Sequence, residues 1–191
     1  MLDQSIVLIG MPGSGKSTVG KLLAKKTKSP FVDTDKLIIA ASGKPLQRII
    51  EEDGLSKFNQ YEHDVIMNLN PEVPTIIATG GSAVLNHEAM MHLKDVGVVI
   101  FLDADLPLLR KRLWNFESRG IVLADTNDSN ANDSNTNDKE NSILEIYKIR
   151  EPMYFKYCDM RVHVHGLGTN KIVAKIIKDI KTHLLAILKT D

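Results

Sequence analysis

Short runs rich in apolar residues recur along the chain and are its clearest pattern. They occupy residues 6–9, 75–78, 98–102 and 160–164, and β-branched side chains are frequent in them. Continuous apolar runs, as opposed to strict alternation with polar residues, are typical of parallel strands that are covered on both faces of a sheet. The pattern therefore predicts buried parallel strands at these four positions.

Between these runs the apolar residues follow a helical spacing. Residues 16–26 place Val19, Leu22 and Leu23 on one face, and residues 105–114 and 170–188 show the same periodicity. Strands that alternate with helices predict an α/β protein, with a parallel sheet and right-handed crossovers. No internal repeat and no linker divides the chain, so we expect one domain over residues 1–191.

One segment breaks this alternation of strands and helices. Residues 125–141 read DTNDSNANDSNTNDKEN and contain almost no apolar side chains. Such a composition cannot bury enough surface to offset the entropy lost on ordering, so we expect a disordered excursion. Two interpretations stay open, a tolerated surface insertion and an elaborated tip on a moving lid. They are compatible, because the segment follows Arg119.

Composition narrows the classes of function. The chain has 24 lysines and arginines against 24 aspartates and glutamates, so its formal net charge gives no electrostatic case for nucleic acid or a membrane as partner. The single cysteine, Cys158, excludes an internal disulfide framework and fits a reducing compartment. No basic leader opens the chain, and no apolar stretch approaches the ~20 residues needed to cross a bilayer. We expect a soluble, cytoplasmic monomer.

A phosphate-binding motif follows the first apolar run. Residues 10–18 read GMPGSGKST and match the pattern G-x-x-x-x-G-K-[ST] completely. The motif also opens an amphipathic helix, whose first N–H groups and dipole favour an anion, so an unrelated glycine turn is a poor alternative. Lys16 is expected to reach the β- and γ-phosphates of ATP, and the Ser17 hydroxyl to bind Mg²⁺. The predicted nucleotide site comprises Gly13, Ser14, Gly15, Lys16, Ser17 and Thr18.

The motifs that follow, taken in order, resemble those of the shikimate kinase family. FVDTD at 31–35 resembles an element at the end of the family's second strand, and the segment around Gly80 and Gly81 resembles its glycine-rich substrate loop. The other segments that carry the resemblance are IIEEDG at 49–54, FNQYE at 58–62, REPMY at 150–154 and GLGTN at 166–170. The resemblance implies a P-loop NTPase fold, a three-layer α/β/α sandwich. It also implies a substrate-binding helical region at about 33–62 and a mobile lid at about 112–142.

The resemblance further implies an activity, the ATP-dependent conversion of shikimate to shikimate 3-phosphate in aromatic amino acid biosynthesis. Asp33 would hold Mg²⁺ through water. Asp35 would accept hydrogen bonds from substrate hydroxyls, and the proton of the attacking one. The alternative for Asp35 is a helix N-cap for residues 36–41.

The same resemblance implies roles for three arginines. Arg112 would stack on adenine, and Arg119 would reach the transferring phosphate when the lid closes. Arg150 would grip the substrate carboxylate, a task suited to the planar guanidinium fork. The alternative for Arg119 and Arg150 is an ordinary solvated or structural ion pair.

Three departures from the family pattern leave the acceptor open. Asn59 stands where the family has a carboxylate-binding arginine, Ser82 replaces a third glycine of the substrate loop, and residues 120–122 read GIV where the family usually has proline and leucines. An amide at position 59 can hydrogen-bond but supplies no charge. The alternatives are therefore a kinase for another hydroxy acid or sugar acid, and an inactive module that only binds nucleotide. The acceptor is expected to contact Asp35, Asn59, Gly80, Gly81 and Arg150.

Overall fold

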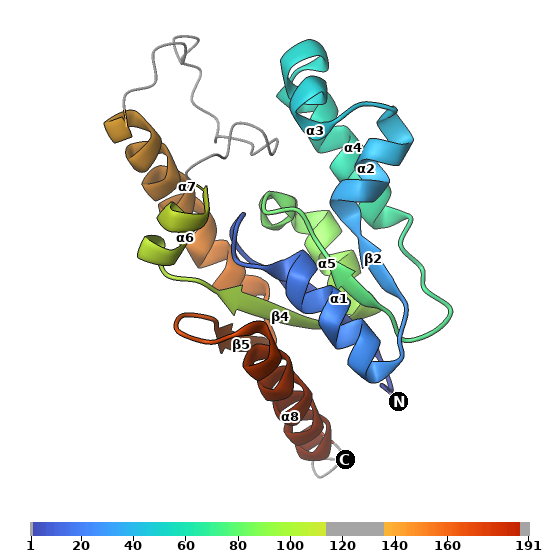
Figure 1. Ribbon diagram of the computed structural model, residues 1–191. Coiled ribbons are helices and arrows are strands. Elements are labelled where there is room, and N and C mark those ends of the chain that lie inside the picture. Colours follow the sequence, from blue (N-terminus) through green and yellow to red (C-terminus); the bar gives the residue numbers. More distant parts are fainter. Residues whose placement is uncertain (1, 114–135, 188–191) are drawn as a thin grey trace.

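The computed structural model describes residues 2–113 and 136–187, and the side chains of residues 2–113 and 142–182. Arg119, the segment 120–122 and most of the lid expected at about 112–142 lie outside the described residues. The same holds for most of the Asn/Asp-rich segment. Figure 1 traces the chain from the N-terminal strand to the C-terminal helix.

Five parallel strands form one sheet in the order β2-β3-β1-β4-β5. The strands are β1 (Ser5–Ile9), β2 (Phe31–Asp33), β3 (Ile76–Ala78), β4 (Gly97–Asp103) and β5 (Met160–His163). All four strands predicted from the apolar runs are confirmed. The fifth, β2, was expected only from the family resemblance, because it is a three-residue edge strand whose side chains are half-buried.

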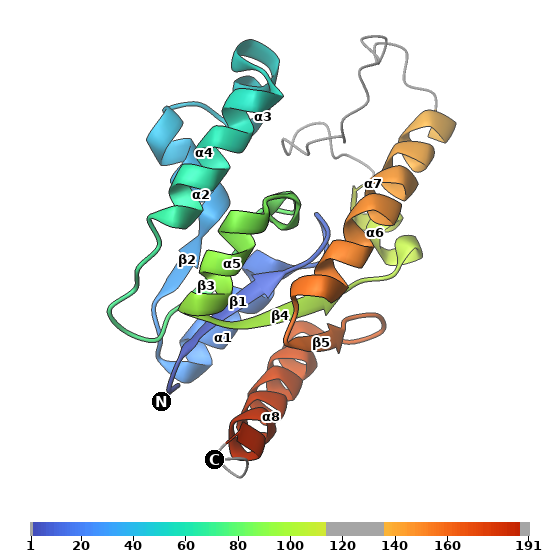
Figure 2. The same ribbon diagram turned by 180° about the vertical axis from the view of Figure 1, so that it is seen from behind.

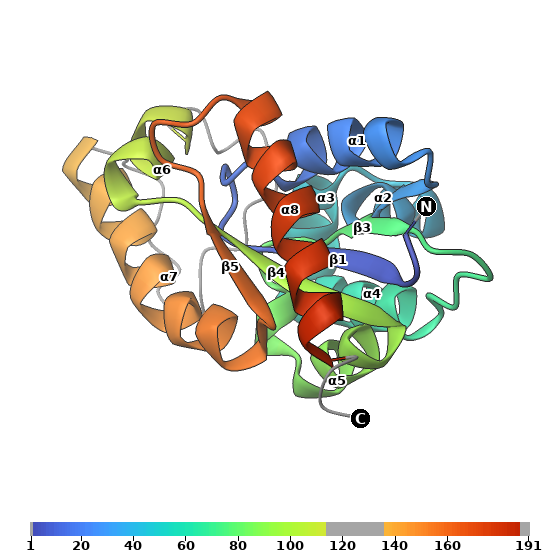
Figure 3. The same ribbon diagram turned by 90° about the horizontal axis from the view of Figure 1, so that it is seen from below.

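Helices cover both faces of the sheet, as the alternating pattern predicts. Figure 3 shows α1 (Lys16–Thr27) and α8 (Thr169–Ile187) together on one face, with α4 (Leu55–Met67), α5 (His87–Val96) and α7 (Thr136–Tyr157) on the other. The remaining helical elements are α2 (Thr34–Ser42), α3 (Leu46–Arg48), η1 (Ile49–Asp53), η2 (Ala83–Leu85) and α6 (Leu106–Leu113). None of the described helices combines the length and apolar character needed to cross a membrane.

The main core lies where the two helical layers meet the central strands. Every residue of β1 and of β4 is buried, which is why these strands read as continuous apolar runs. Leu23 of α1 and Ile176 of α8 are fully buried in the same cluster. The sheet thereby becomes a rigid base for the loops at its carboxyl edge.

The residues from α2 to α4 form an arm with a small core of its own. Ile38, Ile49 and Phe58 are buried together there, separately from the main cluster. Figure 2 shows this arm on one side of the sheet's carboxyl edge, with α6 and the start of α7 on the other. The arm contains most of the region, about 33–62, that was expected to bind the substrate.

Two local expectations are corrected by the helix boundaries. Helix α2 begins at Thr34 with Asp33 at its N-cap position, so Asp35 lies inside the first turn and the N-cap alternative for it is wrong. Helix α7 begins at Thr136, so residues 136–141 are helical instead of disordered. The next turn of α7 buries Ile143 and Ile146, and extending an existing helix costs much less than nucleating one.

Candidate active site

Three segments meet at the carboxyl edge of the sheet. They are the phosphate-binding motif after β1, the junction of β2 and α2 at Asp33–Asp35, and the glycine loop, Thr79–Ser82, after β3. The strand order places β1 where the chain turns from one half of the sheet to the other, which is where open parallel sheets bind their ligands. A cavity of about 510 Å³ opens at this edge, and residues of all three segments line it.

The phosphate-binding loop has the curled backbone that its sequence predicts. Gly13 and Gly15 have φ of 79° and 102°, in the left-handed region that favours glycine. Gly15 is also the N-cap of α1, which begins directly at Lys16. The free N–H groups of the first helical turn therefore lie beside the loop, as an anion site requires.

Lys16 lies folded against its own loop. Its Nζ donates to Gly10 O at 2.7 Å and to Met11 O at 3.0 Å. Burial lowers the pKa of Lys16 to about 8, although the nearby Asp35 carboxylate opposes this shift. A phosphate would offer the ammonium group a full negative charge in place of two carbonyl dipoles.

The residues present fit a nucleotide phosphate together with Mg²⁺. Ser14 Oγ is buried without a hydrogen-bond partner among the described residues, which calls for a bound acceptor or donor. Ser17 lines the cavity, and Asp33 lies close enough to influence the Lys16 ammonium. Oxygen donors of this kind suit Mg²⁺, which keeps waters and shares its shell with phosphates. In the described part of the chain no cluster of three or more His, Cys, Asp or Glu could hold a metal without such help.

The carboxyl groups of Glu62, which is buried, and of Asp35, which is half-buried, meet at Gly80 in the wall of the cavity. A Cβ on Gly80 would lie 2.5 Å from Glu62 Oε1 and 2.9 Å from Asp35 Oδ1. Both carboxyl groups can therefore occupy these positions only because residue 80 is a glycine. Burial raises the pKa of Asp35, and the Lys16 ammonium partly reverses that shift. The Gly80 N–H donates to Thr34 Oγ1 at 3.0 Å, which ties the glycine loop to α2.

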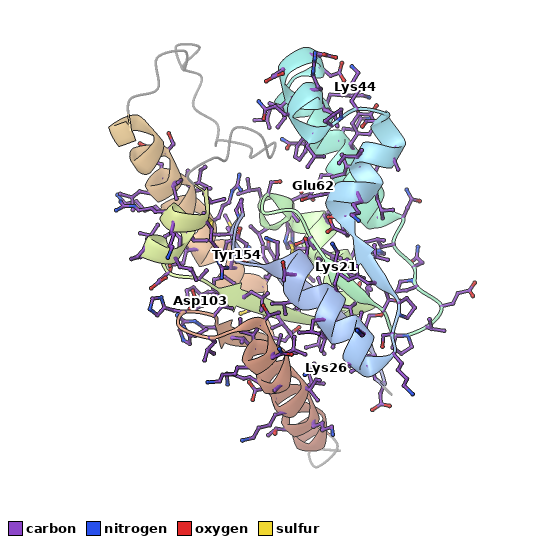
Figure 4. All side chains as sticks on the ribbon, in the orientation of Figure 1. Lys21, Lys26, Lys44, Glu62, Asp103 and Tyr154 are labelled. Atoms are coloured by element: carbon purple, nitrogen blue, oxygen red, sulfur yellow. The ribbon has the colours of Figure 1, made fainter. Side chains whose placement is uncertain are left out.

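Gly81 joins the same loop to the rest of the site. A Cβ on Gly81 would lie 2.5 Å from Pro12 Cδ of the phosphate-binding loop. Its carbonyl accepts a hydrogen bond of 2.7 Å from the hydroxyl of Tyr154 on α7. Figure 4 labels Tyr154 and Glu62, which contact this loop from α7 and from α4. The two glycines thus permit close approach to protein groups on several sides.

Glu62 is the functional candidate that the sequence analysis did not single out. It is 3% exposed, and burial raises its pKa to about 7. The signal was present, because Phe58, Glu62 and Ile66 recur at four-residue spacing and form the buried face of α4. A glutamate within an apolar stripe is seldom buried without a role.

The predicted arginines and Asn59 have different surroundings. Arg150 is 1% exposed and lines the cavity, so it is not a solvated side chain, although burial does not distinguish a binding role from a structural ion pair. Arg112 also lines the cavity, and its guanidinium donates to Gly13 O at 2.9 Å. Asn59 is exposed and is not among the residues that line the cavity. Leu167 and Thr169, from the GLGTN segment at 166–170, also line it.

A parallel α/β sheet with a phosphate-binding loop, an adjoining acidic pocket and a buried arginine defines a P-loop phosphotransferase. The family model for shikimate kinase matches residues 12–181. The chain belongs to the shikimate kinase family.

Individual relatives agree with this assignment. A shikimate kinase of Thermodesulfovibrio yellowstonii is 35% identical over 92% of this chain and 94% of its own. One of Microcystis aeruginosa is 35% identical over 93% and 87%. Among solved structures, shikimate kinase from Acinetobacter baumannii in complex with shikimate has a TM-score of 0.82 at 26% identity, covering 94% of both chains. Shikimate kinase from Aquifex aeolicus has a TM-score of 0.75 at 26% identity, covering 95% and 99%.

Proposed function

We propose that the protein transfers the γ-phosphoryl group of ATP, bound with Mg²⁺, to a hydroxyl of shikimate and forms shikimate 3-phosphate. The observation that carries the proposal is one cavity in which Lys16, the Asp35 carboxyl and the buried Arg150 all line the wall. Together these residues could bind a polyphosphate at Lys16, a hydroxyl at Asp35 and a carboxylate at Arg150. The proposal includes a monomeric enzyme that acts in the cytoplasm.

On the nucleotide side, the chain's task is to align phosphate and to neutralise its charge. The loop N–H groups and Lys16 would hold the β- and γ-phosphates, with Ser17 and Asp33 as the protein groups nearest the metal. Mg²⁺ supplies charge neutralisation at the phosphate oxygens when bound. Arg112 would lie on the adenine side, where it already donates to the loop carbonyls. Arg119 would contribute from the lid.

On the acceptor side, Asp35 would orient the attacking hydroxyl and accept its proton. Its partial burial beside Lys16 favours this use, because a carboxylate withdrawn from water is the stronger proton acceptor. Arg150 would hold the acceptor carboxylate with two parallel hydrogen bonds. The loop at Gly80 and Gly81 would form the adjoining wall, and Asn59 would contribute at most an uncharged contact from α4.

A second candidate is a kinase for a different hydroxy acid or sugar acid. The observation in its favour is that Asn59 offers no charge at a position where the family has an arginine, whereas Arg150 does line the cavity together with the glycine loop. A nucleotide-binding module without turnover is disfavoured, because Lys16, Ser17, Asp33 and Asp35 are all present.

The test is ADP release with ATP, Mg²⁺ and a panel of acceptors that includes shikimate, gluconate and other hydroxy acids. We expect turnover with shikimate, and a loss of at least ~10²-fold in kcat for Lys16→Ala, because one preorganised cation at the developing charge is removed. Circular dichroism serves as the control that this variant is folded. Turnover only with another acid would select the second candidate, and bound but unconsumed ATP would select the inactive module.

A further inference from the structure

Ser82 makes a specific contact with the buried carboxyl of Glu62. The Ser82 hydroxyl donates to Glu62 Oε1 at 2.9 Å, and the two side chains come from the glycine loop and from α4. Ser82 is 5% exposed and also lines the cavity. Its position is the one at which the family pattern has a glycine, and a glycine could not supply this hydrogen bond.

The contact fixes where the Glu62 carboxyl lies. The Oε1 atom that accepts from Ser82 is the same atom that a Cβ on Gly80 would meet at 2.5 Å. The same Cβ on Gly80 would lie 2.9 Å from Asp35 Oδ1. The carboxyl groups of Glu62 and Asp35 therefore both lie next to the backbone of Gly80. Ser82 therefore holds Glu62 next to the residue proposed to orient the acceptor hydroxyl.

Among the described residues, four ionisable groups from three other elements act on Glu62. They are Asp35 on α2, Lys16 on α1, and Arg150 and Tyr154 on α7. When Asp35 and Glu62 are both ionised, two negative charges are matched by Lys16 and Arg150. An acceptor carboxylate would add a third negative charge to the same pair of cations. Anion binding and ionisation of Glu62 therefore oppose each other.

We infer that Ser82 is a positioning residue, whose hydroxyl holds the Glu62 carboxyl against Gly80 beside Asp35 and thereby makes acceptor binding depend on the charge of Glu62. The inference rests on the proposed function, in which the acceptor is an anion held by Arg150. It identifies Ser82 and Glu62 as a pair that tunes affinity for the acceptor without contacting the transferred phosphoryl group.

The kinetic test follows the KM for shikimate from pH 5.5 to pH 8.5. For the wild type we expect KM to rise several-fold as the pH passes through about 7, where burial places the pKa of Glu62. In Ser82→Ala the hydrogen bond that favours ionised Glu62 is gone, so the rise should move upward by about one pH unit. Ser82→Thr keeps a hydroxyl and should keep the wild-type profile. The pH profile of the KM for ATP should be the same in Ser82→Ala as in the wild type.

A merely structural role for Ser82 gives a different result. Loss of packing would raise the KM of Ser82→Ala by the same factor at every pH and leave the midpoint of the profile in place. Either that outcome or a Ser82→Thr variant that behaves like Ser82→Ala would overturn the inference.

A second measurement needs no substrate, namely the free energy of unfolding as a function of pH. The ordinary pKa of Glu62, 4.5, applies to the unfolded chain, and the folded pKa is about 7. The folded state therefore binds more protons between these values, so the contribution of Glu62 to stability falls as the pH rises from 4.5 to about 7 and then levels off. Ser82→Ala should extend this fall to higher pH, and Glu62→Gln should remove it. If the free energy of unfolding depends on pH in the same way in the wild type and in Ser82→Ala, Ser82 does not influence the ionisation of Glu62.

The two readouts separate the inference from the proposed function. If the wild type does not phosphorylate shikimate, the proposed function fails and the acceptor part of the inference falls with it. The stability profiles then still decide whether Ser82 controls Glu62. If shikimate is phosphorylated but both profiles of Ser82→Ala match the wild type, only the inference fails.

Discussion

At position 81 one methyl group would decide whether two loops can touch. A Cβ there would meet Pro12 Cδ at 2.5 Å and Pro12 Cγ at 2.7 Å, distances that real Cβ contacts do not reach. The backbone of Gly81 is not in the left-handed region, so alanine is excluded by the neighbour and not by its own φ. The phosphate-binding loop and the glycine loop can therefore pack against each other because residue 81 has no side chain.

Gly81→Ala should lower the free energy of unfolding by about 1–3 kcal/mol, the usual cost of forcing a methyl group into a packed contact. The matched control is Gly168→Ala, because a Cβ at Gly168 meets nothing within 4 Å and its φ is also outside the left-handed region. Urea unfolding of both variants measures the difference. If Gly81→Ala and Gly168→Ala have equal free energies of unfolding, Pro12 can move aside at no measurable cost.

At the scale of elements, Asn86 links the segment after the glycine loop to both α4 and α5 through side-chain hydrogen bonds. Asn86 is the N-cap of α5, and its Oδ1 accepts from Ala89 N at 3.0 Å. Its Nδ2 donates to His63 Nδ1 at 3.1 Å on α4, one residue beyond Glu62. The cap thus stabilises a helix and also links it to the helix that carries Glu62.

Asn86→Ala removes both contacts and should destabilise the fold by about 1 kcal/mol, the typical value of an N-cap. Asn86→Asp is the matched control, because aspartate caps equally well but cannot donate to His63. Chemical denaturation of the two variants separates the cap from the link. An alanine variant as stable as the wild type would show that the cap contributes nothing.

At the scale of the whole molecule, the proton affinity of Lys16 is a property of the assembled fold. Groups from α2, α4 and α7 surround it, and burial lowers its pKa to about 8. A bound phosphate would stabilise the ammonium form and raise that pKa again. Nucleotide binding at this loop would therefore be coupled to the uptake of a proton in mildly alkaline solution.

ADP affinity should accordingly be constant below pH 7 and fall as the pH rises through about 8, approaching tenfold per pH unit. The sign follows because the free protein loses the Lys16 proton at a lower pH than the complex does. Isothermal calorimetry between pH 6.5 and pH 9.5 measures it, and Lys16→Met should bind weakly without this dependence. An ADP affinity that does not change up to pH 9.5 would contradict the coupling.

Local patterns in the chain determined much of the fold. The apolar runs placed four of the five strands, because buried parallel strands need continuous apolar sequence. The motif at 10–18 placed the phosphate-binding loop, because its glycines and its lysine act at fixed, short separations. The short edge strand β2 and the true start of α7 escaped this reasoning, since neither carries a strong periodic signal.

Only the tertiary structure decided which groups come together around the glycine loop. Ser82 and Glu62 are 20 residues apart, and Tyr154 reaches Gly81 across 73 residues, so no spacing rule could pair them. The same packing buried Arg150 and left Asn59 exposed. Ionisation of Glu62 and Lys16 likewise depends on burial by several distant elements, since desolvation acts through everything that surrounds a charge. The sequence by itself therefore determined where the phosphate-binding motif lies, and the packed fold decided which charged groups surround the cavity beside it.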